Sequence, residues 1–311
     1  MLKRMSLKKI LVCSLVIFSI GLLNFIPKED INLKEEVVYV KDNPNISYVY
    51  LENKNNYLTR VNVDVKSKSV ESKARELLEN LIAGSKNIPK GFNGIIPPTV
   101  KINSIKYTNE TLKVDFTNDL LDVKKEYEEK IIEAITYTLT SIEDIKYVII
   151  YMNGEILTHL PKSNKTLPST LDRSFGINKE YKISNDKDIT STTIYYISNL
   201  NNQEYYIPVT KINNDTRDKI EIIVEELSNQ GNKRLMSYLN SNTRLISSNI
   251  DNNNLLLVFN DYILNDGDEQ DILKEVIDTI CLSIKDNYSV DTVSFNINDK
   301  EINKTDLKSL E

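Results

Sequence analysis

Two stretches of this chain follow one pattern, and this internal repeat limits the possible fold more than any other feature of the sequence. Residues 46–157 and 192–302 share the order of their apolar runs, turn residues and helix signals, at an offset of about 142–148 positions. Each stretch opens with a tyrosine-rich segment, YVYL in the first and IYYI in the second. The repeat therefore predicts two similar domains, each with a core of its own.

The same seven elements are predicted in each copy. Tyrosine-rich segments on either side of an asparagine-rich turn predict a hairpin. Apolar residues spaced i, i+3, i+4, i+7 then predict an amphipathic helix, with N-caps at Ser69 and Asp215 and ends at Gly84 and Gly231. The predicted strands lie at 48–51, 57–61, 100–107, 112–116 and 146–152, and at 194–197, 205–209, 244–250, 255–259 and 292–297. The second helices are expected at about 125–140 and 269–284.

The order β-β-α-β-β-α-β indicates the α+β class. Because hairpin connections dominate, we expect each copy to fold as one mostly antiparallel sheet with its helices packed on it. The chain divides into a basic tail (1–9), an apolar segment (10–26), a spacer (27–45), domain 1 (46–157), a linker (158–191), a divergent domain 2 (192–302) and a tail (303–311).

The apolar segment 10–26 follows four positive residues and is typical of a membrane signal. Its 17 residues are at the short end for a spanning helix. The positive flank predicts a single-pass anchor in the cytoplasmic membrane, with the N-terminus inside and the body outside. Two alternatives stay open, namely a signal peptide cleaved near Gly21 and a lipoprotein lipidated at Cys13.

Charge and composition exclude several classes of function. The net charge is −6 although the first nine residues carry +4, so the rest of the chain is acidic, which argues against nucleic-acid binding. The cysteines, Cys13 and Cys281, are too few for a zinc site, and His159 is the single histidine. No phosphate-binding glycine motif occurs. We therefore expect no cofactor, no metal and no catalytic residue.

Carboxylates are numerous, so an acid–base pair stays open on counts alone. Asp115 is the strongest candidate because it alternates with Val114 and Phe116 at a predicted strand end. It could act as a general base or ion ligand, or as a hydrogen-bond acceptor at the strand end. The second copy has Val258 at the aligned position, and we therefore interpret Asp115 as structural.

Several short pieces, taken in their order and spacing, resemble the GerM domain of sporulation and germination proteins. They are YVYL at 48–51, LIAGS at 81–85, IPPT at 96–99, VDF at 114–116, TLT at 138–140 and NGE at 153–155. The resemblance marks six positions as family-motif residues, which we interpret as structural: Gly84, Pro97, Asp115, Phe116, Thr138 and Gly154. The second copy departs from the motifs, with Val258 for the aspartate and Ile280-Cys281-Leu282 for TLT.

The resemblance implies a non-enzymatic envelope protein that assembles at the interface between mother cell and forespore. Its expected partners are other exported sporulation proteins, the membrane through the N-terminal helix, and further copies of the chain. An alternative function is binding of peptidoglycan, because exposed tyrosines can stack on sugars. An enzyme that uses carboxylates such as Asp115 is the least favoured of the three.

Overall fold

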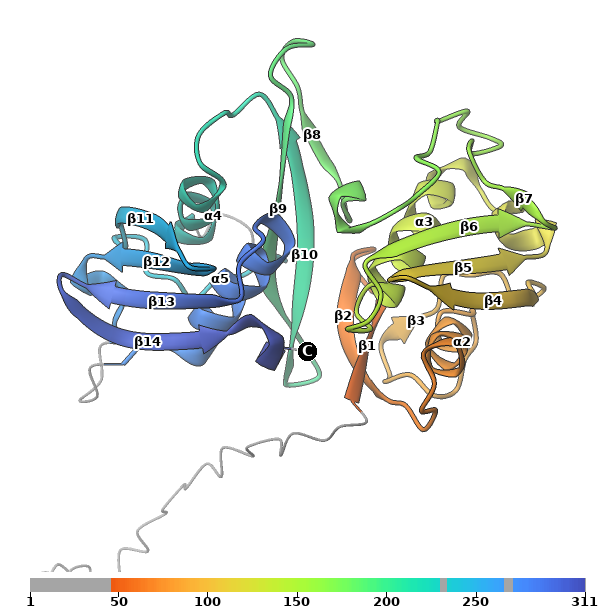
Figure 1. The fold of residues 1–311 in the computed structure, drawn as a ribbon, viewed down its shortest axis with the longest axis horizontal. Helices are drawn as coiled ribbons and strands as arrows, with labels where there is room; N and C mark the ends of the chain where they lie inside the picture. Colours follow the sequence, from red (N-terminus) through yellow and green to blue (C-terminus); the bar gives the residue numbers. More distant parts are fainter. Residues whose placement is uncertain (1–45, 230–233, 266–270, 311) are drawn as a thin grey trace, which may run out of the picture. The chain divides into compact units, whose positions relative to one another are not determined.

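The computed structural model describes residues 46–229, 234–265 and 271–310 (Figure 1). The predicted membrane segment, its basic flank, the spacer, Cys13, Gly21 and Gly231 lie outside these residues. Among the described helices, none combines the length and the apolar character needed to cross a membrane.

The seven predicted elements occur in the same order in the two copies. Each copy adds a further strand at its end, and the first copy has an additional short strand at Phe92–Asn93. The first module comprises β1 (Ile46–Asn53), β2 (Leu58–Asp64), α2 (Val70–Asn80), β3 (Phe92–Asn93), β4 (Ile102–Thr108), β5 (Thr111–Phe116), η1 (Asn118–Leu121), α3 (Lys125–Leu139), β6 (Tyr147–Met152) and β7 (Glu155–Ile156). The linker holds η2 (Arg173–Phe175) and β8 (Glu180–Lys182). The second module comprises β9 (Thr190–Leu200), β10 (Gln203–Asn213), α4 (Lys219–Ser228), β11 (Leu245–Asp251), β12 (Asn254–Phe259), η3 (Asp261–Ile263), α5 (Lys274–Asn287), β13 (Thr292–Ile297), β14 (Lys300–Asp306) and η4 (Leu307–Leu310).

The prediction of one sheet per copy is wrong. Each module has a four-stranded sheet, β4-β5-β6-β7 or β11-β12-β13-β14, in which the central pair is parallel and the outer pairs are antiparallel. The opening hairpins belong to neither sheet. They join with β3 and β8 in a separate six-stranded sheet (Figure 1). Val49, Tyr50 and Leu51 of β1 are all fully buried, so this strand is covered on both faces, unlike an outer strand of a one-sided sheet.

The helix starts are confirmed in one copy and shifted in the other. Ser69 caps α2, and its hydroxyl accepts a hydrogen bond from the backbone N–H of Ser72. In α4 the cap is Asp218 rather than Asp215. The Asp215 carboxylate forms an ion pair with Arg217, so it is not available to the helix.

An equivalent contact fastens a helix to the hairpin in each module. The backbone N–H of Tyr50 in β1 donates to the Thr138 hydroxyl of α3 at 3.0 Å. The backbone N–H of Tyr195 in β9 donates to the Ser283 hydroxyl of α5 at 2.9 Å. Tyr50 and Tyr195 are therefore equivalent positions. In each module a helix hydroxyl accepts from a buried backbone N–H of the hairpin, which would otherwise have no hydrogen-bond partner.

The first part of the linker, residues 158–178, is packed against the first module and does not form a free tether. Leu160, Leu167, Leu171 and Ile177 are buried with the core of that module. The buried Glu128 carboxylate of α3 accepts hydrogen bonds from two linker N–H groups, those of residues 162 and 163, at 2.6 and 2.7 Å. The tail after residue 302 is also ordered on the second module, because β14 continues to Asp306 and Leu307 is buried.

Asn178 of the linker joins the hairpins of the two modules. Its side-chain oxygen accepts from the backbone N–H of Leu58 in β2 at 2.8 Å, and its amide nitrogen donates to the carbonyl oxygen of the same residue at 2.8 Å. The amide nitrogen also donates to the carbonyl of Pro208 in β10 at 2.7 Å. A direct β2–β10 pairing follows at Arg60 and Tyr206. The two modules therefore share one hydrogen-bonded sheet.

We expect Asn178→Gly to lower the free energy of unfolding by about 2 kcal/mol, because three backbone groups lose their partner and water can replace it in part. Glycine is the appropriate replacement because Asn178 has φ +48°, which other side chains rarely adopt. The measurement is urea unfolding. Asn164→Gly, at φ +56° in the same linker, is the control for backbone flexibility. Equal losses in both variants would contradict a role of the side chain in joining the sheet.

Candidate functional site: the crevice between the hairpins

The six motif positions predicted from the sequence lie in turns, on a strand and on a helix, and they do not converge on one site. Gly84 and Gly154 have φ +83° and +85°, and Phe116 is fully buried. The carbonyl of Pro97 accepts from the backbone of Val100 in a turn. The remaining two, Thr138 and Asp115, are hydrogen-bond acceptors. None of the six lines the crevice described below.

Asp115 lies on β5 and accepts hydrogen bonds at the end of its sheet. Its carboxylate accepts from the backbone N–H of Gly154 at 2.9 Å and from the Asn103 side chain at 3.2 Å. These contacts fasten the β6–β7 turn to the neighbouring strand, as expected of a strand-end acceptor. His159 is exposed, and its ring bonds to the adjacent hydroxyl of Thr158.

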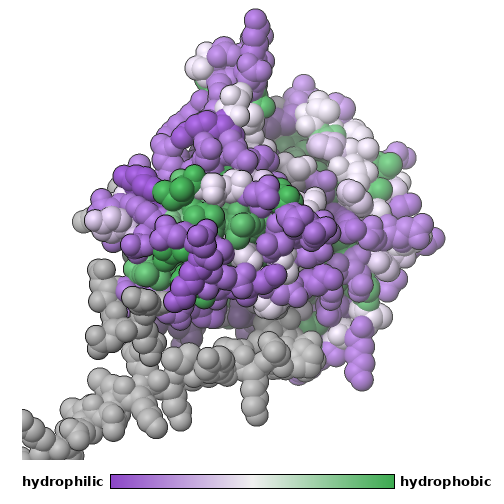
Figure 2. Space-filling view, turned by 60° about the vertical axis from the view of Figure 1, so that its left-hand side comes forward, coloured by the Kyte–Doolittle hydropathy of each residue, from purple (hydrophilic) through white to green (hydrophobic). Residues whose placement is uncertain are grey.

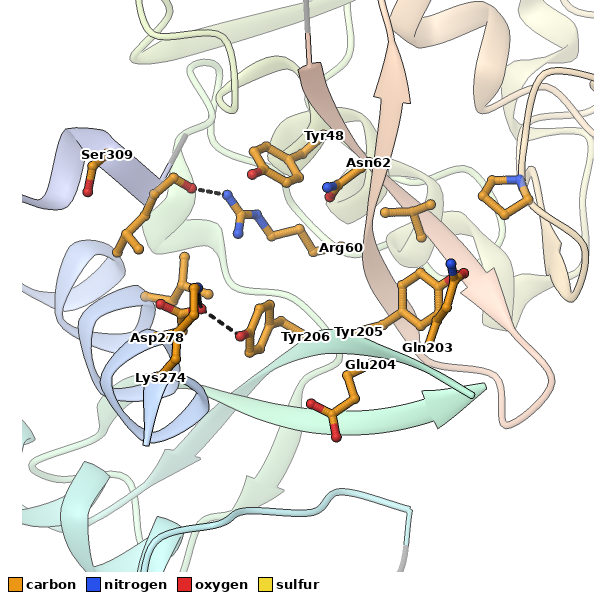
Figure 3. A pocket seen from close by; sticks show the side chains of 14 residues that line it. Tyr48, Arg60, Asn62, Gln203, Glu204, Tyr205, Tyr206, Lys274, Asp278 and Ser309 are labelled. Carbon is orange, nitrogen blue, oxygen red and sulfur yellow. Dashed lines mark hydrogen bonds and ion pairs between the residues drawn. The ribbon is translucent and has the colours of Figure 1, made fainter. Parts of the chain in front are cut away.

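A crevice of 590 Å³ lies where β2 and β10 meet (Figure 3). Its volume is within the range of about 300–1,000 Å³ that is usual for ligand sites. Strand β1 contributes Tyr48, β2 contributes Arg60, and β10 contributes Tyr205 and Tyr206. Helix α5 and the short helix η4 form the opposite wall. The lining includes Tyr48, Arg60, Asn62, Gln203, Glu204, Tyr205, Tyr206, Lys274, Asp278 and Ser309.

Arg60 points across the crevice (Figure 3). Its guanidinium carbon lies 3.4 Å from the centroid of the Tyr48 ring, and one of its nitrogens donates to the backbone carbonyl of Leu310. The cation–π contact and this hydrogen bond hold the guanidinium in one plane. A residue of the first module thereby contacts the end of the described chain, 250 positions away.

The other charges of the crevice are paired with one another or with phenols. The buried Asp278 carboxylate accepts from the Tyr206 hydroxyl at 2.7 Å and forms an ion pair with Lys274. Glu204 accepts from the hydroxyl of Tyr238. Burial, together with the nearby Asp278 charge, raises the pKa of Tyr206 well above its usual value. This phenol therefore stays protonated and acts as a donor.

A narrower recess, which shares Tyr48 and Arg60 with the crevice, extends to a buried charged cluster between the modules. The Arg173 guanidinium of the linker donates to both oxygens of Asp286 in α5, at 2.8 and 3.1 Å. The hydroxyls of Tyr50 and Tyr195 lie 3.2 Å apart, and that of Tyr195 donates to the same aspartate at 2.9 Å. Equivalent tyrosines of the two modules thus meet around one ion pair.

The described residues provide little for catalysis. Across the described ranges, no group of three or more His, Cys, Asp or Glu side chains is placed to hold a metal ion. Cys281 is buried, and burial raises the pKa of its thiol far above the usual range, so it is not a nucleophile at neutral pH.

An apolar area lies on the surface of the second module. Figure 2, with the second module turned forward, shows hydrophobic residues gathered on an otherwise mainly hydrophilic face. Edge strand β11 exposes 64% of Ile246 and 52% of Ile250. In the first module, the edge strand β4 has Asn103 at the equivalent bulge and Tyr107 at the position equivalent to Ile250. The two modules therefore present different edges to solvent.

The two modules are similar to domains of known proteins. A family model described as "Germane: Sporulation and spore germination" matches residues 46–158 and 193–303, which are the two modules. The chain belongs to the Germane family. It is 32% identical over 262 residues to the spore germination protein GerM of Bacillus subtilis, covering 81% of this chain and 71% of that protein. It matches the structure of the tandem GerMN domains of B. subtilis GerM with a TM-score of 0.74 and 29% identity, over 82% of this chain and 91% of that one.

The sequence predicts the tyrosines of the Germane modules on strands but does not bring them together. It places Tyr48 and Tyr205 on hairpins that cover a sheet face, with each hairpin in its own domain. No local signal indicated that β2 and β10 pair, because the crevice forms only when the two modules meet.

Proposed function

We propose that this protein is a non-enzymatic interaction module of the sporulation envelope, with its two-module body outside the cytoplasmic membrane and the segment 10–26 as its anchor. Membership of a family described by sporulation and spore germination supports the general role. The charge pattern around the apolar segment supports export of the body. The proposed place of action is the interface between mother cell and forespore, with other exported sporulation proteins as partners.

The observation that carries the proposal is the exposed apolar edge of the second module. Ile246 is the bulged residue of β11, and its side chain is mostly exposed to solvent. A bulge hinders the addition of another strand, so we infer contact through side chains rather than through backbone pairing. Apolar side chains that gather on an exposed surface mark an interaction site because their burial on binding is favourable.

The test is in-cell cross-linking during sporulation, followed by purification of the tagged full chain and identification of the captured proteins. Ile246→Asp is expected to abolish capture of exported sporulation proteins, because binding would bury a charge. Ile156→Asp is the matched control, since Ile156 is also an exposed isoleucine on an edge strand but belongs to the first module. Equal capture by all three proteins would refute the role of β11, and capture of cytosolic proteins alone would refute export.

The second candidate is binding of cell-wall glycan. The tyrosine-lined crevice between β2 and β10 favours it specifically.

A further inference from the structure

We propose that the crevice between β2, β10, α5 and η4 binds a short, uncharged segment of a glycan. This site is separate from the β11 edge and does not depend on the proposed assembly role. The inference rests on three observations, namely the crevice's volume and lining, the internal pairing of its charges, and the planar side chains that it presents.

The first observation concerns shape. The crevice is formed by residues of both modules and measures 590 Å³, enough for a small oligosaccharide. One wall is fixed by the pairing of Arg60 with Tyr206 and the other by the buried Asp278 of α5. The side chains of the crevice therefore stand on strands and a helix that hold them in place before a ligand arrives, which lowers the entropic cost of binding.

The second observation concerns charge. The Asp278 carboxylate pairs with Lys274, Glu204 accepts from the Tyr238 hydroxyl, and the Arg60 guanidinium is held by the Leu310 carbonyl. A cationic ligand would have to break one of the carboxylate contacts, and an anionic ligand would face Glu204 and Asp278 as well as Arg60. An uncharged ligand avoids that cost because it needs only hydrogen bonds and surface contact.

The third observation concerns the groups that remain for a ligand. Tyr205 is half-buried, with its ring packed edge-on against Phe92 at 4.8 Å between centroids, and Tyr48 carries the planar guanidinium of Arg60. The side chains of Asn62 and Gln203 are exposed beside them, and the Gln203 side-chain oxygen accepts from the Tyr205 hydroxyl at 2.7 Å, which leaves the Gln203 amide N–H groups for a ligand. Flat aromatic and guanidinium surfaces suit the C–H faces of sugar rings, and amide groups both donate to and accept from hydroxyls. Arg60 has five N–H donors, so its bond to Leu310 leaves capacity for ligand oxygens.

The experiment measures binding of tetra-N-acetylchitotetraose to the full chain in detergent micelles, by saturation-transfer NMR and by calorimetry. We expect saturation of the sugar ring protons and a dissociation constant that Tyr205→Ala raises about tenfold or more, which corresponds to about 1.4 kcal/mol. Gln203→Ala, at an exposed position where the fold is not at risk, should also weaken binding. Tyr262→Ala, which removes an exposed tyrosine outside the crevice, should leave it unchanged.

Parallel titrations use acetyl-tetra-alanine amide, an uncharged peptide of similar length, and free glutamate as an ionic probe. The proposal is overturned if the chitotetraose does not bind, if the peptide binds in its place, or if Tyr262→Ala weakens binding as much as the crevice variants do. Melting curves of each variant separate loss of binding from loss of fold. The assay contains no other sporulation protein, so its failure leaves the β11 proposal standing, and the reverse also holds.

Discussion

Asp286→Ala is expected to lower the free energy of unfolding by about 3–5 kcal/mol, since it leaves a mostly buried guanidinium without its counter-charge. The Asp286 side chain is 1% exposed and that of Arg173 is 21% exposed. Partial access of water to Arg173 favours the lower end of that range. The hydroxyl of Tyr195 loses its acceptor in the same variant, which adds to the loss. Urea unfolding of the full chain in detergent measures the effect.

Two comparison variants isolate the charge. Lys146→Ala breaks an ion pair with Glu110 whose side chains are both more than half exposed, and we expect no measurable change. The double variant Arg173→Met with Asp286→Leu removes both charges and should recover most of the stability lost in Asp286→Ala. If Asp286→Ala and Lys146→Ala had the same small effect, the buried ion pair would not hold the modules together.

The stability of the protein should fall as the pH rises through about 7, and Glu133→Gln should remove this part of the pH dependence. Burial of the Glu133 carboxyl in α3 raises its pKa from 4.5 to about 7, although the nearby Lys179 ammonium and the N–H of Asn178 act in the opposite direction. Its oxygens lie 3.7 Å from that ammonium and 2.9 Å from that backbone nitrogen. Protonation of this side chain therefore stabilises the folded state.

The sign follows from linkage. Because the folded pKa is higher than the unfolded one, the stabilisation by the proton is complete below pH 4.5 and is lost as the pH rises to about 7. The shift corresponds to about 3 kcal/mol. Urea unfolding from pH 4 to pH 9 should show the stability of Glu133→Gln rising relative to the wild type by that amount and levelling off above pH 7.5. Parallel curves for the two proteins would show that Glu133 ionises normally.

Glu129 provides the matched control for this titration. It is on the same helix face, but hydrogen bonds from Lys165 and Lys179 outweigh its desolvation and lower its pKa. A group of this kind stabilises the fold above its unfolded pKa and loses that contribution as the pH falls. Glu129→Gln should therefore change the curve in the opposite direction and at a lower pH than Glu133→Gln.

Local sequence patterns predict contacts within one module but not contacts between the modules. The chemistry of Asp115 could be inferred from the sequence because its partners, Gly154 and Asn103, lie in the same module and follow from strand alternation. The crevice could not, because Arg60 of the first module meets Leu310 at the end of the second only after the modules have joined. The segments concerned are up to 250 positions apart, and no local periodicity encodes such a meeting.

The sequence by itself determined the tandem repeat, the order of the elements in each copy, the apolar faces of the helices and the asparagine-rich turns. All of these depend on interactions within a few residues, and the positive φ angles at Asn109, Asn153, Asn252 and Asn298 agree with the turn chemistry. Only the tertiary structure decided which sheet the hairpins join. Strand edges are chemically alike, so pairing depends on which edges burial brings together. Here a linker residue, Asn178, and a buried ion pair join the equivalent hairpins of the two modules, and that choice creates the crevice.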